Sequence, residues 1–393
     1  METAKYFTLK ASDKLQKVDV HLDATTYRHA DFRNVSITHK TLRGGPSDGV
    51  DMLEISNGQM TLFVMPTRGM GIWKAHVRQG GKKVRVGWHS PVPVPVHPRN
   101  VPLYQPDGFG WLRGFNEFVV RCGLESNGAP DFDEKGTLRH PLHGHIANTP
   151  AWKVTLEVDD DMQVVRVTGV VREARMFFNS LELESTLTVP FTGTSFRIDD
   201  DIENLSARES ELELLYHINT GEPVAGDGAR LHIPFRRVCP RNAWAATQLD
   251  TLFDCHAPTT GEAETCYYYD LAADEAGNTR VFLENASSDF GVSVGFNKNE
   301  FPCYCQWKCQ HASQDGYVTG MEPALNFPND KTFEKANGRV VTLAPGAKRH
   351  FGLDFQFSVD VNEVAAEAGK IRRLQETCSD PVIEREPIPE WAN

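Results

Sequence analysis

The sequence predicts an all-β protein built from antiparallel sheets with few helices. Segments in which apolar and polar residues alternate follow one another along the chain, whereas helical periodicity is scarce. Strands without intervening helices favour antiparallel pairing over parallel βαβ units. No internal repeat or low-complexity linker divides the 393 residues. The length alone suggests roughly two or three domains, but large all-β architectures often fold as one.

The predicted strands mix β-branched and aromatic residues and are separated by clusters of turn-forming residues. They are expected at 58–66, 152–158, 162–173, 180–190, 194–204, 210–219, 280–285, 291–297 and 347–359. Segment 361–377 is rich in helix-forming residues, so it predicts one C-terminal helix after the last strand.

Two adjoining stretches lack the pattern of strands. Residues 90–106 are rich in proline, which has no amide donor for a central strand, and residues 107–130 are dense in glycine and aromatic residues. Long ordered insertions are often functional, so we expect 90–130 to form the wall of a pocket. The alternative is a surface connection packed by its own aromatic side chains.

The composition narrows the class of protein. The chain has 41 Lys and Arg residues against 53 Asp and Glu residues, a net charge of −12. Nucleic acids and anionic membranes are bound by clustered cations, so we expect neither as a partner. The first residues contain no apolar signal segment, no stretch approaches 18 apolar residues, and eight cysteines do not make a disulfide scaffold at this length. We therefore expect a cytoplasmic protein with reduced thiols, and the oligomeric state is left open.

Three segments place a histidine or a glutamate beside Gly, Asn or Pro at the end of a strand-like run. They are 140–152 with His143 and His145, 214–223 with His217, and 316–330 with Glu322. Burying Glu322 in its apolar neighbourhood is costly unless the carboxylate is paired, which favours a functional role. A lone His217 is also compatible with a hydrogen-bonded core histidine.

Metal binding is a second interpretation of some of these residues. His143 and His145 are two positions apart and would share one face of a strand, so a metal pair is conceivable. Cys303, Cys305 and Cys309 lack the two-residue gaps usual in zinc sites. Because 301–310 also has the pattern of a strand, we favour core packing of these cysteines, and we expect no metal and no cofactor.

In combination, the three segments resemble the aldose 1-epimerase (galactose mutarotase-like) superfamily, and most closely a divergent branch without an assigned substrate. Residues 142–145 are similar to the superfamily's N-x-L-H-G-G motif, with His145 in place of the second glycine. Residues 216–219 are similar to its T-N-H segment, and residues 320–328 to the segment with the catalytic glutamate. Similarity at 67–72 and 121–128 extends the resemblance over about residues 20–358.

The resemblance implies a β-supersandwich, a single large domain over residues 1–393 with a sugar groove on one concave face. It implies an isomerase that interconverts the anomers of a free sugar or sugar derivative without a metal. Glu322 is then the candidate base, His217 the candidate acid, and His143 a third catalytic residue that holds the ring oxygen or a neighbouring hydroxyl. The candidate substrate-binding residues are Arg68, His145, Asn326, Trp307 and Trp111. The superfamily's sugar-binding aspartate has no clear counterpart, although Asp270 lies in the corresponding region.

Ring opening at the anomeric carbon needs one base and one acid. An ordinary glutamate pKa is too low for a good general base near neutral pH, so we expect burial to raise the pKa of Glu322. Two alternatives remain open at this point. One is a carbohydrate-binding protein without turnover, and the other is a metal-dependent isomerase or lyase that uses His143, His145 and Glu322.

Overall fold

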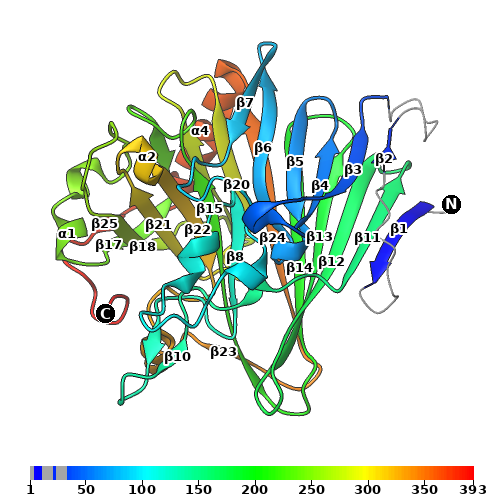
Figure 1. Ribbon diagram of the computed structural model, residues 1–393. Helices are drawn as coiled ribbons and strands as arrows, with labels where there is room; N and C mark the ends of the chain where they lie inside the picture. Colours follow the sequence, from blue (N-terminus) through cyan, green and yellow to red (C-terminus); the bar gives the residue numbers. More distant parts are fainter. Residues whose placement is uncertain (1–3, 11–20, 24–32) are drawn as a thin grey trace.

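The computed structural model describes residues 4–10, 21–23 and 33–393, and two large sheets account for most of its regular structure (Figure 1). The first sheet has nine antiparallel strands. In spatial order they are β1 (Ala4–Lys10), β11 (Lys153–Asp159), β12 (Val164–Ala174), β13 (Ser180–Pro190), β14 (Ser195–Asn204), β24 (Lys348–Ser358), β20 (Gly291–Asn297), β19 (Asn278–Glu284) and β16 (Arg230–His232).

The second sheet has fourteen strands and is antiparallel except for its short last strand. Its main path runs β2 (His21–Leu22), β3 (Ser36–Thr41), β4 (Asp51–Ser56), β5 (Met60–Met65), β6 (Gly71–Gln79), β8 (Val119–Leu124), β15 (Ser210–Thr220), β22 (Val318–Ala324), β21 (Cys303–Cys309), β18 (Thr265–Leu271), β17 (Phe235–Pro240) and β25 (Val382–Ile383). Beside this path, β7 (Lys82–Val86) pairs with β6 and β23 (Val341–Leu343) pairs with β15. A separate small hairpin joins β9 (Asp131–Phe132) and β10 (Leu138–His140).

Helices are few in the described part of the chain. They are α1 (Ala243–Ala246), α2 (Ser313–Gly316), α3 (Lys331–Ala336) and α4 (Val361–Glu376). The longest is α4, which packs Val364, Ala368 and Ile371 against Phe282 on β19 of the nine-stranded sheet. The prediction of a mostly antiparallel β-sandwich with one C-terminal helix at 361–377 is therefore confirmed.

Most predicted boundaries agree with the observed strands, but one prediction is wrong. Residues 107–130 were expected to contain no strand, yet Val119–Leu124 forms β8, a central strand of the fourteen-stranded sheet. All six of its residues are buried, and a fully buried strand lacks the alternation that reveals a half-buried one. The rest of the 90–130 stretch contains only short 3₁₀ turns, of which η5 (Gly110–Gly114) is the longest.

The alternation of side chains along β15 separates the two faces of the fourteen-stranded sheet. Leu214, Tyr216 and Ile218 belong to the main core, which lies between the two sheets. Leu215 points to the opposite face and belongs to a second apolar cluster. His217 lies on that second face with Leu215, so this face, turned away from the partner sheet, is where the candidate chemistry gathers.

No helix among the described residues is long and apolar enough to span a membrane.

Candidate active site

The register of β15 and β22 brings His217 and Glu322 together. Leu215 pairs with Ala324 and Ile218 pairs with Met321 in this antiparallel ladder, so His217 and Glu322 are direct neighbours across it. His217 Nε2 lies 3.2 Å from Glu322 Oε1. The two side chains are only 6% and 3% exposed. The structure thus places the two predicted catalytic residues within reach of one shared proton.

A cavity of about 310 Å³ opens onto this pair. Aromatic and apolar side chains from the 109–115 stretch, residues 129–130, Leu142 and Pro328 form much of its wall. Trp111, Phe115 and Trp307 surround His217, with ring centroids 6.4, 5.1 and 5.0 Å from its imidazole. From the 90–130 stretch, the residues that line this cavity are Phe109, Trp111, Leu112, Phe115, Ala129 and Pro130.

Burial in this apolar cavity sets the charge state of the pair. Desolvation raises the pKa of Glu322 well above its usual value, and the nearby Cys266 thiol acts in the same direction. Desolvation also lowers the pKa of His217 well below its usual value, assisted by the neighbouring His143. Both shifts favour a neutral carboxylic acid beside a neutral imidazole in the unliganded pocket.

Asn219 fixes the tautomer of His217. The Nδ1 atom of His217 lies 2.5 Å from Asn219 Oδ1. The Asn219 amide nitrogen donates to the carbonyls of Glu117 and His217, so its oxygen must be the acceptor of the His217 bond. His217 therefore carries its proton on Nδ1 when neutral, and its Nε2 lone pair faces Glu322.

His143 enters the cavity from a turn rather than from a strand. Its backbone φ is 58°, and the following Gly144 has a φ of 67°. A side chain at Gly144 would begin 2.1 Å from the Ser126 carbonyl, so only glycine fits there. His143 Nδ1 lies 2.7 Å from the Asn127 carbonyl and must donate to it, which leaves Nε2 for the cavity. Burial lowers the pKa of His143 to about 4, so the ring is a neutral acceptor near neutral pH.

Arg241 and Glu264 also line the cavity, and neither was anticipated from the sequence. Arg241 Nη2 lies 3.1 Å from Glu264 Oε1, and the Trp307 indole N–H donates to Glu264 Oε2 at 2.7 Å. Both residues flank strands, since Arg241 follows β17 and Glu264 precedes β18. No strand is predicted at 235–240 or 265–271, so the strand-end pattern that singled out His217 and Glu322 does not reach them.

The chain is similar to known proteins in sequence and in fold. Residues 47–357 match the model of a family described as a domain of unknown function, DUF4432. The chain belongs to the DUF4432 family. A Klebsiella pneumoniae protein, whose crystal structure is named as that of a candidate aldose 1-epimerase, is 31% identical over 99% of this chain and 98% of its own, with a TM-score of 0.89.

A more distant structure shows the same fold. A galactose mutarotase-like protein from Clostridium acetobutylicum superimposes with a TM-score of 0.55 at 15% identity, over 82% of this chain and 98% of its own. No curated protein matches the chain in sequence. The DUF4432 chain therefore has the galactose mutarotase-like fold, and the predicted resemblance and fold class are confirmed.

Two predicted substrate-binding residues do not line the cavity of this DUF4432 chain. Arg68 is 1% exposed and is held by Glu117, 2.6 Å from its Nη2 atom, and by the Gly114 carbonyl at 2.9 Å. Asn326 is fully buried and exchanges amide hydrogen bonds with Asn127, the residue whose carbonyl receives His143. The polar atoms of Arg68 and Asn326 already have partners in the protein. We therefore interpret both residues as structural supports of the loops around the cavity.

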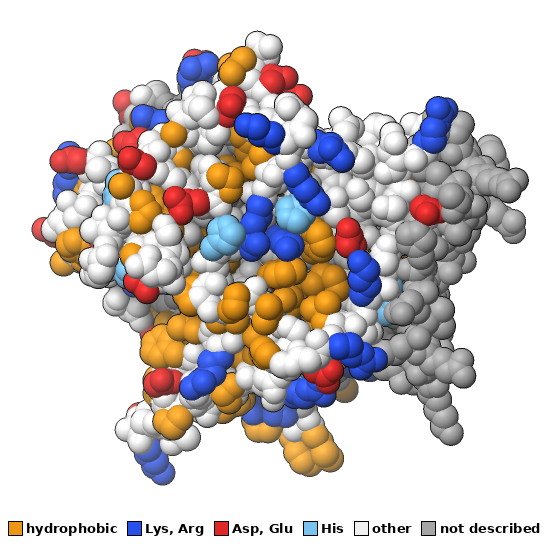
Figure 2. Space-filling view, turned by 45° about the horizontal axis from the view of Figure 1, so that its top comes forward, with side chains coloured by type: hydrophobic (Ala, Val, Ile, Leu, Met, Phe, Trp, Pro, Cys, Tyr) orange, Lys and Arg blue, Asp and Glu red, His pale blue; other side chains and the backbone are white. Residues whose placement is uncertain are grey.

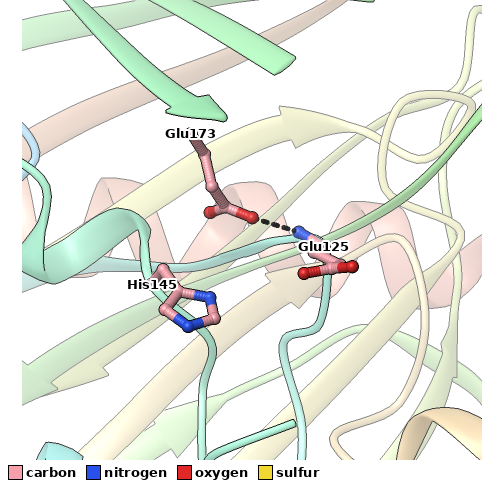
Figure 3. Close-up of side chains that lie close together, drawn as sticks. All are labelled: Glu125, His145 and Glu173. Carbon is pink, nitrogen blue, oxygen red and sulfur yellow. Dashed lines mark hydrogen bonds between the residues drawn. The ribbon is translucent and has the colours of Figure 1, made fainter. Parts of the chain in front are cut away.

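His145 was expected to share a face with His143, and the structure separates them. The two residues lie in a turn rather than on a strand, so the period-2 argument does not apply. His145 Nε2 lies 3.0 Å from the Tyr104 hydroxyl, and the ring faces Glu125 and Glu173 (Figure 3). His145 is therefore not among the residues that line the cavity with Glu322. The alternative of a metal site shared by His143, His145 and Glu322 required it to be there.

The group of Glu125, His145 and Glu173 offers ligand atoms within 4.8 Å of one another. Both carboxylate oxygens of Glu173 already accept backbone N–H groups, one from Leu124 at 2.8 Å and one from Glu125 at 2.9 Å. Figure 3 shows the bond from Glu125. Glu173 thus ties β12 of one sheet to the end of β8 in the other. A structural role accounts for its burial.

The other residues that the sequence singled out are cysteines on β21 and Asp270. Cys303, Cys305 and Cys309 are buried in the second apolar cluster, as core packing predicts, and Cys305 also lines the cavity, because it pairs with Glu322 across the β21–β22 ladder. Asp270 is paired with Lys298 and does not line the cavity. A larger hollow of about 650 Å³ lies between α4 and the nine-stranded sheet, but no histidine is among the described residues that line it. The smaller cavity is therefore the candidate active site.

Proposed function

We propose that this protein interconverts the anomers of a free monosaccharide by general acid–base catalysis. The observation that carries the proposal is the His217–Glu322 pair, which faces a small cavity from neighbouring strands at 3.2 Å. Mutarotation needs one group to take the proton from the anomeric hydroxyl and another to protonate the ring oxygen. The C1–O5 bond then opens to the aldehyde, the C1–C2 bond rotates, and closure on the other face gives the other anomer.

One exchangeable proton on the pair is sufficient for both steps. In the empty cavity that proton is favoured on Glu322, and sugar hydroxyls that donate to the carboxylate favour its ionised form when substrate binds. Glu322 then acts as base toward the anomeric hydroxyl while His217 Nε2–H protonates the ring oxygen. The closing step reverses the two roles, so the pair returns to its starting state and titrates as a unit.

His143 serves this scheme as an acceptor. Its Nε2 carries no proton in the neutral ring and accepts from a sugar hydroxyl, rather than donating to the ring oxygen. Trp111 and Trp307 supply flat apolar surfaces for the carbon face of the sugar ring. Glu264 offers its carboxylate as an acceptor for further sugar hydroxyls. We assign it the role of the superfamily's sugar-binding aspartate, which has no clear counterpart in the sequence.

The cavity favours a neutral monosaccharide. Its volume of about 310 Å³ lies at the lower end for small-molecule sites, which suits one sugar ring. Arg241 is the one cationic side chain among the described residues that line it, and Glu264 already neutralises it. A phosphate or carboxylate on the substrate would therefore find no unpaired cation.

The test is one-dimensional NMR of freshly dissolved single anomers, with a panel of neutral sugars, uronic acids and sugar phosphates. We expect acceleration for neutral sugars, and a loss of about 10²–10⁴-fold in Glu322→Gln. His232 and Glu284 form a second His–Glu pair at 2.8 Å, outside the cavity, so Glu284→Gln is the matched control and should retain full activity. Sugar binding by the wild type without faster exchange would contradict catalysis.

A further inference from the structure

The hairpin that connects β12 to β13 carries an exposed apolar tip. Met176, Phe177 and Phe178 are 78%, 76% and 55% exposed. The tip lies at the lower end of Figure 1, and hydrophobic side chains are visible at the corresponding edge in Figure 2. Three consecutive large apolar side chains on a projecting turn are unfavourable in water, and such patches usually mark an interaction surface.

The backbone conformation of this tip is also unfavourable for a phenylalanine at position 177. The turn is closed by hydrogen bonds from Arg175 N–H to Asn179 O and from Phe178 N–H to Arg175 O, each 3.0 Å long. Phe177 adopts a φ of 72°, a conformation that glycine, asparagine or aspartate adopts far more readily. The folded monomer gains nothing from a bulky side chain here, so the aromatic ring needs another explanation.

Cations surround the tip. The Arg175 guanidinium lies 3.5 Å from the Phe178 ring centroid, and Arg208 Nη2 donates to the Phe178 carbonyl at 3.0 Å. Arg172 lies on β12 before the tip and is 46% exposed, but it is paired with Glu182 at 2.6 Å, so Arg175 and Arg208 supply the positive charge of the tip. In a chain with a net charge of −12, this is a local basic and apolar surface. Its complement is an acidic surface with exposed apolar side chains.

Such a surface occurs on the same molecule. A cleft of about 410 Å³ beside the β9–β10 hairpin is lined by Asp131, Glu134 and Asp330, against a single cation, Arg139. Phe132, which is 40% exposed, supplies its apolar side chain. The hairpin with β10 lies at the same end of the molecule as the tip (Figure 1).

We propose that the partner of the tip is a second copy of this chain, with the tip of each copy docked in the acidic cleft of the other. Two complementary surfaces at one end of the molecule allow a closed twofold dimer, in which both contacts form at once. With about 200 Å² for each large side chain, the three exposed fractions amount to about 400 Å² per tip. Two tips and two clefts then bury about 1,600 Å², the usual size of a specific interface.

The mass of the full chain is measured by sedimentation equilibrium from about 1 to 100 µM. We expect a dimer for the wild type, and at least a tenfold weaker dimer for Phe177→Asn, which suits the turn and should keep the fold intact. Met162 lies 66% exposed in the turn at the other end of β12, so Met162→Asn is the matched control and should dimerise like the wild type.

A charge exchange identifies the two surfaces. Arg175→Glu alone places like charges against the acidic cleft, and Glu134→Arg alone does so against the basic tip, so each variant should be monomeric. An equimolar mixture of the two should dimerise, because both contacts of the mixed dimer again join opposite charges. A monomeric wild type, or a dimer that Phe177→Asn leaves unchanged, overturns the proposal. A monomeric wild type that floats with anionic vesicles through Phe177 assigns the tip to a membrane instead.

Discussion

At the residue scale, the chemistry of the candidate site depends on whether His217 or Glu322 holds the proton that they share, and the surrounding residues determine this. The cavity desolvates both groups, which favours their neutral forms. Asn219 holds the His217 proton on Nδ1 and so aims Nε2 at Glu322. The surroundings thus supply both the orientation and the pKa values that an acid–base pair needs.

Asn219 is therefore expected to tune the pH dependence of the reaction. In Asn219→Asp, a carboxylate accepts from His217 Nδ1–H and favours the charged imidazolium, so the pKa of His217 rises. The optimum of kcat/KM should move to higher pH by about one unit or more. This shift of the optimum is measured by monitoring the rate of anomer exchange with NMR across pH 4–9.

Asn219→Ala is the comparison for this variant. It removes the acceptor without adding charge, so kcat should fall while the optimum does not rise. Thermal melts establish that both proteins are folded. If Asn219→Asp retains the wild-type pH profile, His217 is not the group whose protonation limits the reaction.

Some of the predicted site residues meet in the candidate cavity and others do not. His217, Glu322, His143, Trp111 and Trp307 all line the cavity. Arg68 and Asn326 do not, because a motif shows which residues are near one another in the chain but not which way their side chains point. Arg241 and Glu264 were missed because their approach depends on the pairing of β17, β18 and β21, which spans long connections.

At the element scale, strands with one polar face could be predicted, and strands without one could not. The segment 180–190 alternates strictly, and β13 has the same bounds. The β8 strand is buried on both faces, so its sequence resembles the loops around it. The same difficulty affects the candidate site, since β15, which carries His217, is paired with β8.

Strand β15 also carries a buried carboxyl outside the cavity. Glu213 accepts from the Asn127 backbone N–H at 3.0 Å and from the Asn326 amide at 3.1 Å, and burial raises its pKa to about 8. A carboxyl with a raised folded-state pKa binds its proton more tightly in the folded protein. Its contribution to stability is therefore complete below about pH 4.5 and is lost as pH rises toward 8.

Glu213→Gln should remove this dependence. The difference in unfolding free energy between wild type and variant should change with pH by up to about 1.4 kcal/mol per pH unit between pH 5 and 8. Urea unfolding at four pH values measures the slope. Glu203→Gln is the control, because Glu203 is a partly exposed partner of Lys348. Parallel curves for wild type and Glu213→Gln would show that Glu213 is already ionised at pH 5.

The N-terminus of the C-terminal helix α4 is stabilised by a local capping interaction. Asp360 precedes α4, and its Oδ1 atom accepts from the N–H groups of Asn362 at 2.8 Å and Glu363 at 3.0 Å. Asp360→Ala leaves both amides without this acceptor and should lower the unfolding free energy by about 1 kcal/mol in guanidinium titrations. Asp360→Asn retains the acceptor and should stay within a few tenths of a kcal/mol. Equal losses in the two variants would assign the effect to charge.

At the scale of the whole molecule, the site and the sandwich core are built on opposite faces of one sheet. The cavity is lined by the fourteen-stranded sheet and by the loops that cover it, and no strand of the nine-stranded sheet is among its described lining residues. The contact between the two sheets includes a buried ion pair. Arg121 on β8 joins Asp200 on β14, with Arg121 Nη2 2.9 Å from Asp200 Oδ1.

This arrangement predicts that stability and catalysis can be changed separately. Asp200→Asn leaves the Arg121 charge uncompensated in the core, so the unfolding free energy should fall by about 3–5 kcal/mol. In Arg121→Met with Asp200→Leu, both charges are absent, so the loss should be smaller than the sum of the two single losses by at least about 2 kcal/mol. Denaturant titrations of the four proteins give this coupling energy.

The rate of anomer exchange should not fall with the unfolding free energy that Asp200→Asn loses. His217 and Glu322 are positioned by the β15–β22 ladder, the Asn219 hydrogen bond and the cavity walls. Asp200 contacts β15 through the Tyr216 hydroxyl, on the core face opposite His217, and an amide oxygen at position 200 can still accept that hydrogen bond. At a temperature where Asp200→Asn is fully folded, its kcat should therefore stay within about twofold of the wild type, whereas Glu322→Gln loses activity without a comparable loss of stability. A large fall in kcat in folded Asp200→Asn would mean that the nine-stranded sheet helps to hold the acid–base pair in place.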